Sequence, residues 1–301
     1  MNLRFVEAFY WAVSLKSVTR AAEKLFVTQS ALSSRIAVLE EELGVMLLDR
    51  SGRQFRLTAA GNRFLKSATR LLAMEREIKA EMGSGVTRAT TLRIGAIESV
   101  LHSWLIGWVQ QTRRQYPALA LELTVETTPV LIEQMRRGTL DLTFTALPAS
   151  GDGVQVRTIS PMPMAFVGNT AIHRAASYSM AELAQFDLLT FQRGSQPHVA
   201  LLDLFRQEQL DVRRVHTISS ISAMLRLVEG GFGIATLPVD AVAGIGQRMP
   251  IRVLSNAPRL PELPIHISVR EDPTDPTVAS LVESAQLYAD ASDLASKKVL
   301  D

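Results

Sequence analysis

Residues 28–44, TQSALSSRIAVLEEELG, decide how the N-terminal part of this chain folds. Apolar residues recur there at spacings of four, three and four, which predicts a helix with one buried side. These residues are Leu32, Ile36, Leu39 and Leu43. Thr28 is a suitable N-cap, and Gly44 suits the left-handed residue that ends a helix.

The exposed side of this helix is polar and nearly free of acid over its first two turns. It carries Gln29, Ser30, Ser33, Ser34 and Arg35. The backbone amides at a helix start also favour negative charge, so with Thr28 this face suits a polyanion. An amphipathic core helix of an enzyme would show the same pattern, and both interpretations stay open on this stretch alone.

Two shorter helices precede it. Apolar spacing from Leu3 to Val13 predicts the first, and Ser17 is placed to cap the second. Only Phe26 and Val27 separate the second helix from residues 28–44. So short a joint forces a sharp turn, which is the helix-turn-helix arrangement.

A basic hairpin is predicted after Gly44. In DRSGRQFRL, residues 49–57, Ser51 and Gly52 supply the turn. The three arginines would then lie where a phosphate backbone runs beside an inserted helix. They are Arg50, Arg53 and Arg56. A solvated basic loop is the alternative.

Composition allows two domains and removes some chemistry. The chain has 301 residues, 47% hydrophobic and 21% charged, with no cysteine, so disulfides and thiolate metal sites are excluded. Residues 1–90 hold 14 Lys and Arg against 9 Asp and Glu, so the small positive excess lies with the predicted hairpin and helices. No signal core or spanning apolar run is apparent, so we expect a cytoplasmic protein that does not enter a membrane.

From Thr58 to about Glu81 the pattern predicts one long helix with a heptad seam, interrupted by Glu75. The apolar seam positions are Phe64, Ala68, Leu71, Ile78 and Met82. Such a seam needs a second helix, either in another subunit or in its own domain. The sequence MGSGVT at 82–87 then predicts a flexible joint.

Beyond residue 90, short apolar strands alternate with amphipathic helices. This predicts a mostly parallel α/β sheet, and the alternation occurs twice, which predicts two lobes joined by two crossings. Enzyme signatures are missing: no G-x-S-x-G occurs, and GGFGIAT at 230–236 lacks the third glycine of a dinucleotide fingerprint. The five histidines show no metal spacing. A periplasmic-type solute binder would explain a cleft but not the basic helical head.

The head resembles a known family. Residues 3–65, through SVTRAAEKLFVTQSALSSRIAVLEEELGVMLLDR and GRQFRLTAAG, are similar to the winged helix-turn-helix of the LysR-type transcriptional regulators. Ser34 stands where that family usually has Arg, Lys or Gln, and Ala37 stands at an often basic position, so these departures concern the base preference. Residues 92–290 resemble the family's effector-binding region, most clearly in RRGTLDLTFTALP and LRLVEGGFGIATLP.

The resemblance implies an organisation. It implies an all-α winged helix-turn-helix at 1–58, a linker helix and hinge at 59–90, and an α/β two-lobed, periplasmic-binding-protein-like effector domain at 91–301. Lobe I would hold about 91–161 and 267–301, and lobe II about 162–266. The linker helix would pair with its twin in a homodimer, and the helices with Trp104, Trp108, Met224 and Leu225 resemble further dimer contacts, although these residues also fit an ordinary core.

The resemblance also implies a function. We expect a transcriptional regulator that binds double-stranded promoter DNA as a dimer or dimer of dimers, works with RNA polymerase, and is not an enzyme. No cofactor is expected, but a small, anionic effector is. It would bind where strands end and helices begin, at Ser99, Thr128, Thr145, Gln192, Arg193 and Ser195. The serines and threonines there would equally serve as helix caps. A small-molecule binder with only non-specific DNA affinity is the alternative function.

Overall fold

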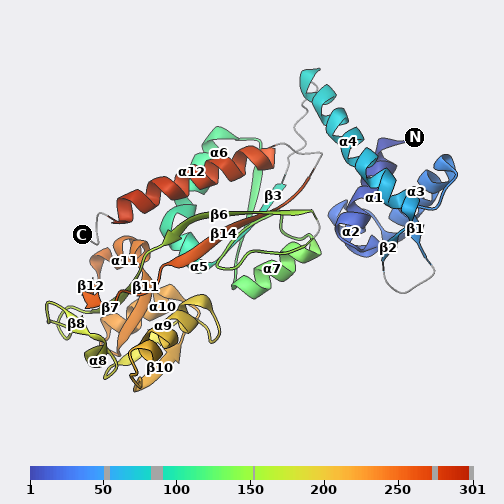
Figure 1. Ribbon diagram of the computed structural model, residues 1–301. Coiled ribbons are helices and arrows are strands. Elements are labelled where there is room, and N and C mark those ends of the chain that lie inside the picture. Colours follow the sequence, from blue (N-terminus) through green and yellow to red (C-terminus); the bar gives the residue numbers. More distant parts are fainter. Residues whose placement is uncertain (51–54, 83–90, 152, 273–276, 298–301) are drawn as a thin grey trace.

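The computed structural model describes residues 1–50, 55–82, 91–151, 153–272 and 277–297. A helical N-terminal domain is followed by two α/β lobes (Figure 1). The elements of the N-terminal domain are α1 (Leu3–Ser14), α2 (Val18–Lys24), α3 (Gln29–Leu43), β1 (Leu48–Asp49), β2 (Arg56–Leu57) and α4 (Ala59–Glu81). This is the predicted winged helix-turn-helix with its long helix. The turn at Ser51 and Gly52, Arg53, and most of the joint at 82–87 lie outside the described residues.

Local chemistry fixes the ends of these helices. The Ser17 side chain accepts a hydrogen bond from the Arg20 amide at the start of α2, and Thr28 caps α3. Gly44 ends α3 with φ +67°. The predicted buried stripe is confirmed at Leu32, Ile36 and Leu39 but not at Leu43, which is 36% exposed. Glu40, which was not part of the predicted stripe, is buried at 4% exposure.

The predicted seam of α4 is packed in the N-terminal domain at its start and exposed at its end. Phe64 packs edge-to-face on Phe9 at 5.4 Å between ring centroids, and Ala68 is fully buried against the same domain. Ile78 and Met82 are 52% and 69% exposed. The seam prediction was therefore wrong for Phe64 and Ala68, which belong to the core of their own domain. The second half remains an exposed apolar surface.

Each lobe is built on a five-stranded sheet. Lobe I has the strand order β4-β3-β5-β14-β6 and lobe II has β10-β9-β11-β7-β12. The strands of lobe I are β3 (Thr91–Ala96), β4 (Ala120–Val125), β5 (Leu142–Thr145), β6 (Val154–Met162) and β14 (Leu263–Arg270). Those of lobe II are β7 (Met164–Asn169), β9 (Asp187–Thr190), β10 (Arg214–Thr217), β11 (Ile234–Pro238) and β12 (Ile251–Val253), with β8 (Tyr178–Ser179) and β13 (Asn256–Ala257) as a separate small pair.

Each five-stranded sheet contains three neighbouring parallel strands, and its remaining pairings are antiparallel. In lobe I, β3 pairs in parallel with β4 and β5, whereas β14 pairs antiparallel with β5 and β6. Lobe II has the same plan, with β9 parallel to β10 and β11. Because Leu263 already pairs with Met162, the chain returns to lobe I at residue 263 instead of about 267.

Helices cover both faces of the lobe I sheet (Figure 1). The helices of the lobes are α5 (Glu98–Val100), a π-helical turn (Leu101–Leu105), α6 (Ile106–Gln115), α7 (Thr128–Arg137), α8 (Met180–Leu183), α9 (Gln196–Gln207), α10 (Ile221–Glu229), α11 (Val239–Ile245), a 3-10 turn (Gly246–Arg248) and α12 (Thr277–Lys297). Helices α6 and α12 lie on one face of the sheet and α7 on the other.

The aromatic and apolar residues considered for dimer contacts are core residues. Trp104 and Trp108 pack edge-to-face on Phe144, and both are at most 5% exposed. Met224 and Leu225 in α10 are fully buried. They were therefore wrong as exposed contact residues, and on these helices Ile106, 48% exposed, is the large apolar side chain that faces out.

The described part of the chain offers neither a membrane span nor a metal cluster. No helix there is both long and apolar enough to cross a bilayer. No group of three or more His, Asp or Glu side chains is arranged to hold a metal ion among those residues.

Candidate functional site

The first candidate site is the N-terminal half of α3. Thr28 accepts a hydrogen bond from the Ala31 amide at 3.2 Å and its hydroxyl lies 3.0 Å from that of Ser30. Thr28 and the polar residues after it, Gln29, Ser30, Ser33 and Ser34, are exposed, and Arg35 is half-buried. The face predicted to meet a polyanion is therefore open. Ala37, the second departure from the family pattern, is exposed on the same helix.

Glu40 joins α3 to the hairpin. Its Oε1 accepts hydrogen bonds from the amides of Leu47 at 2.8 Å and Leu48 at 3.0 Å. Its Oε2 accepts from Arg50 at 2.9 Å. One buried carboxylate thus holds the start of β1 against α3, and this sets the position of the hairpin relative to the helix. No pattern in the sequence indicates this role, because Glu40 stands in a run of three glutamates of which the other two are exposed.

The hairpin carries its cations as predicted where the structure describes them. Arg50, directly after β1, and Arg56 on β2 are exposed, and the two strands pair antiparallel. Arg53 lies outside the described residues. Arg50 already has Glu40 as a partner, so part of its charge is neutralised within the protein. Arg56, exposed on β2, is the arginine that we test as a phosphate contact.

Replacing Arg56 with alanine is expected to weaken binding to all duplexes similarly. The slope of log K against log salt should fall by about one unit for each phosphate that the protein no longer neutralises. Fluorescence anisotropy of a labelled duplex at several salt concentrations measures this slope. Arg206→Ala, an exposed arginine on α9 of lobe II, is the matched control. An unchanged slope in Arg56→Ala would reject the hairpin as a DNA-contacting wing.

The second candidate site is a cavity of about 460 Å³ between the two lobes. Its walls come from the segments that follow parallel strands in both sheets. Lobe I contributes Ile97, Glu98, Ser99 and Leu101 after β3, residues 125–129 at the end of β4 and after it, and Ala146 and Leu147 after β5. Lobe II contributes residues 191–197 after β9 and Ser219 after β10. This is where ligands bind in open α/β sheets, since strand ends and helix N-termini meet there.

Five of the six residues predicted for an effector line this cavity. They are Ser99, Thr128, Gln192, Arg193 and Ser195. Thr145 lies beneath the wall, fully buried, and its hydroxyl donates to the Leu147 carbonyl at 2.7 Å. Thr145 thus shapes the wall instead of forming it.

Two of the cavity hydroxyls have structural partners. Thr128 accepts a hydrogen bond from the Ala146 amide at 3.3 Å, which ties α7 to the end of β5. Ser195 caps α9 by accepting from the His198 amide at 3.4 Å. The capping alternative therefore holds for Ser195, and also for Ser220, which caps α10. Ser99 is 3% exposed and borders the cavity.

Charges around the cavity are mixed. Arg193 is its basic residue and is exposed, whereas Glu98 and Glu126 are acidic. Glu98 does not face the cavity as a free charge: its Oε2 accepts from the Ile221 amide at 2.9 Å, and its Oε1 lies 3.4 Å from both Ser220 Oγ and His102 Nε2. Its repulsion of an anion in the cavity is thus reduced, because the carboxylate is bound to the N-terminus of α10 in the other lobe.

His198 supports the loop that carries the lobe II residues. Its Nδ1 accepts a hydrogen bond from the Gly194 amide at 3.3 Å, which requires a neutral ring. Burial, and secondarily the Arg193 charge, lower its pKa below the usual 6.5. Sequence reasoning considered His198 only as a metal ligand and missed this role.

The free energy of unfolding is expected to fall as pH drops below about 6.5, because the unfolded chain takes up a proton on His198 before the folded chain does. The loss continues until pH reaches the lowered folded-state pKa and then levels off. Urea unfolding over this pH range measures it. Burial also lowers the pKa values of His173 and His266. The contribution of His198 to the loss of stability is therefore measured by comparison with His198→Asn, which keeps an acceptor but does not titrate. An identical pH profile in this variant would contradict the assignment.

Two family models match the chain. The bacterial regulatory helix-turn-helix of the lysR family matches residues 3–62, and the LysR substrate binding domain matches residues 87–288. The chain belongs to the LysR family. This LysR-type protein is a DNA-binding transcriptional regulator with an effector-binding domain, as the sequence predicted.

Its relatives are regulators too. The LysR-type chain is 28% identical over 300 residues to the HTH-type transcriptional regulator BenM of Acinetobacter baylyi, covering 96% of this chain and 97% of BenM. It is 30% identical over 250 residues to the regulator BudR of Raoultella terrigena, covering 79% of this chain and 84% of BudR. These relatives confirm the family and the regulatory function.

Solved LysR-type structures share the fold. Full-length BenM matches with a TM-score of 0.57 at 26% identity, over 96% of this chain and 97% of that one. A full-length OxyR variant from Pseudomonas aeruginosa matches with a TM-score of 0.63 at 25% identity, over 95% of each chain. The helix-turn-helix followed by two α/β lobes is therefore the arrangement of complete regulators of this family.

Proposed function

We propose that this LysR-type regulator binds an interrupted palindrome in promoter DNA as a homodimer or dimer of dimers, and that a small anionic molecule in the interlobe cavity sets its output. The observation that carries the proposal is the cavity itself, which takes its walls from both lobes. A ligand there favours one arrangement of the lobes over another, and can shift an equilibrium only through that difference.

The DNA-binding half of the proposal rests on α3 and the hairpin. In the helix-turn-helix arrangement, side chains at the N-terminal end of the second helix reach base edges, while cations beside it contact phosphates. Gln29, Ser33 and Ser34 would therefore read bases, and Arg56 would position the domain. The exposed second half of α4, with Ile78 and Met82, supports pairing with a second subunit.

The anionic class of the effector rests on the helix starts. The N-termini of α7 and α9 both reach the cavity, and their free amides favour negative charge. Arg193 adds a cation on the lobe II side. We propose that the effector acts without a cofactor, that the chain catalyses no reaction, and that the regulator works in the cytoplasm with RNA polymerase.

Selection from the host genome tests the DNA function. The purified protein is incubated with sheared genomic DNA at near-physiological salt, and the bound fragments are sequenced. Enrichment of intergenic fragments that share a dyad supports the regulator, and the neighbouring genes nominate the effector. Gln29→Ala with Ser33→Ala should lose the dyad, since both positions are exposed and the fold is retained. Uniform recovery by the unaltered protein would leave only non-specific attraction.

A panel of small mono- and dicarboxylic acids tests the cavity. An acid present at 100 times its Kd stabilises the folded chain by about 2.7 kcal/mol, which a thermal unfolding scan detects. A matched panel of amines and neutral sugars is the control. Stabilisation by the control panel alone would reject the anionic class.

A further inference from the structure

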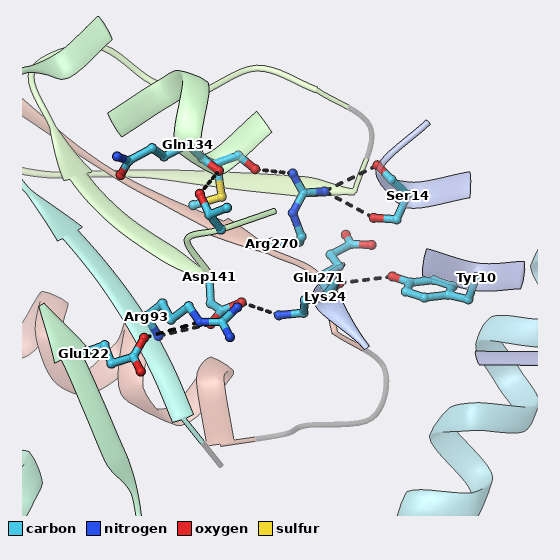
Figure 2. Close-up of polar contacts among 11 residues, drawn as sticks. Tyr10, Ser14, Lys24, Arg93, Glu122, Gln134, Asp141, Arg270 and Glu271 are labelled. Carbon is cyan, nitrogen blue, oxygen red and sulfur yellow. Dashed lines mark hydrogen bonds and ion pairs between the residues drawn. The ribbon is translucent and has the colours of Figure 1, made fainter. Parts of the chain in front are cut away.

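The N-terminal domain contacts lobe I (Figure 2), at the end that lies away from lobe II (Figure 1). Lys24 of α2 forms an ion pair with Asp141, which precedes β5. Arg270 at the end of β14 donates from Nη1 to Ser14 Oγ at 3.2 Å. The Tyr10 hydroxyl donates to the Glu271 carbonyl at 3.1 Å. We refer to these six residues as the interdomain contact.

Most of the contact is shielded from solvent, with Glu271 as its exposed member. The side chains of Lys24 and Asp141 are 14% and 11% exposed, and Arg270 is 4% exposed. Leu15 is 2% exposed and lies so near Gly138 that a Cβ there would be 2.6 Å from its Cδ2. Buried charges are costly unless they are paired, so separating the domains would leave Asp141 and Arg270 without these partners or return them to water.

Three elements run from the interdomain contact to the cavity. Helix α7 starts at the cavity with Thr128, and seven residues later the Met135 carbonyl accepts from Arg270. Strand β5 follows Asp141 and ends just before Ala146 in the cavity wall. Strand β3 is tied to the contact because the Arg93 amide donates to Asp141 Oδ2 at 3.0 Å, and it leads into Ile97–Ser99. Each element spans roughly 10–20 Å, at 1.5 Å per helical or about 3.3 Å per strand residue.

We propose that the end of lobe I formed by Asp141, Arg270 and Glu271 is a docking surface for the DNA-binding domain of the same subunit, coupled to the cavity through β3, β5 and α7. The coupling rests on the proposed role of the cavity as an effector site. Docking fixes the orientation of α3 without covering its polar face, which remains exposed. A ligand that shifts these elements would therefore alter how each subunit presents its recognition helix.

Docking is tested by a disulfide in a chain that has no cysteine of its own. A Cβ placed on Gly153 would be 3.3 Å from Ser14 Oγ, close to the separation that a disulfide bond requires. Oxidised Ser14→Cys/Gly153→Cys should run as a cross-linked monomer on a non-reducing gel. Ser14→Cys/Gly194→Cys is the control, because Gly194 has a similar positive φ but has nothing within 4 Å. A cross-link at dimer mass, or none, would overturn docking within a subunit.

Coupling is tested by hydrogen exchange in the full chain. Lys24→Met removes the ion pair from the N-terminal side only, so a change at the cavity must pass through the interdomain contact. We expect several-fold faster exchange in peptides covering residues 96–101, 126–131 and 145–149. Lys66→Met, an exposed lysine of α4, should leave them unchanged. Unchanged exchange in Lys24→Met would overturn the coupling.

A conservative variant keeps the test sharp if Lys24→Met unfolds the N-terminal domain. Lys24→Arg keeps a cation for Asp141 and leaves the hydrogen bond from the Arg93 amide to Asp141 in place, so exchange should stay slower in it than in Lys24→Met; equal exchange at the cavity in these two variants would overturn the coupling. Both experiments use the protein alone. They can therefore fail while the carboxylic acid panel succeeds, and the reverse also holds.

Discussion

Replacing Glu40 with alanine is expected to destabilise the N-terminal domain by about 2–5 kcal/mol, because each of two buried amides is left without an acceptor at a cost of about 1–3 kcal/mol. The amides of Leu47 and Leu48 lose their acceptor inside the protein, and Arg50 loses its counter-charge. DNA affinity should fall as well, since the hairpin is no longer fixed against α3. Hydrogen exchange of peptides from α1 to α3 measures the stability of this domain separately from the lobes.

Two variants sharpen the Glu40 result. Glu40→Gln keeps one acceptor but not the charge, so its loss should be smaller than that of the alanine variant. Glu41→Ala changes an exposed neighbour and should stay within about 0.5 kcal/mol of the unaltered protein. Equal stability of Glu40→Ala and Glu41→Ala would show that the carboxylate does not hold the hairpin.

Replacing Ser99 with alanine and Thr128 with valine together is expected to lower the affinity for a carboxylate effector roughly 10²–10⁴-fold, because a hydrogen bond to a charged group contributes about 1.5–3 kcal/mol. DNA binding without effector should survive. A modest stability loss of about 1 kcal/mol is expected as well, since Thr128 also accepts from the Ala146 amide.

The measurement is the shift in thermal unfolding with the acid that stabilises the unaltered protein. Ser103→Ala with Thr139→Val is the matched control. It also removes one serine and one threonine hydroxyl from lobe I, but both lie outside the cavity wall. If the Ser99 and Thr128 variant kept the full shift, the effector would have to bind elsewhere.

Local signals made most of the fold predictable. Thr28 and Gly44 marked the ends of α3 correctly because capping depends on residues close in sequence. Strand β6 was not predicted, although it spans nine residues, because it is an edge strand with mixed polarity and no clean alternation. Helix α4 was predicted with the right length, but periodicity could not say that Phe64 packs on Phe9 of its own domain.

The site was predictable in part for the same reason. Positions after strands identified Ser99, Thr128 and Arg193 as cavity residues. Glu40 and Glu98 were missed as structural residues, because their partners lie in other elements and nothing in the spacing of acids identifies a buried one. The pairing of Lys24 with Asp141 joins residues 117 positions apart, which a single sequence cannot reveal.

The pairing of Met162 with Leu263 has a practical consequence for protein engineering. The chain leaves lobe I after Met162 and returns to it at Leu263, and these two residues are neighbours in one sheet, so lobe II is one continuous insertion. Grafting the corresponding segment of BenM or BudR between these points would replace only the Gln192, Arg193 and Ser195 half of the cavity. Chimeras of this kind would show whether the lobe II half of the cavity sets the choice of effector while the DNA-binding domain stays unchanged.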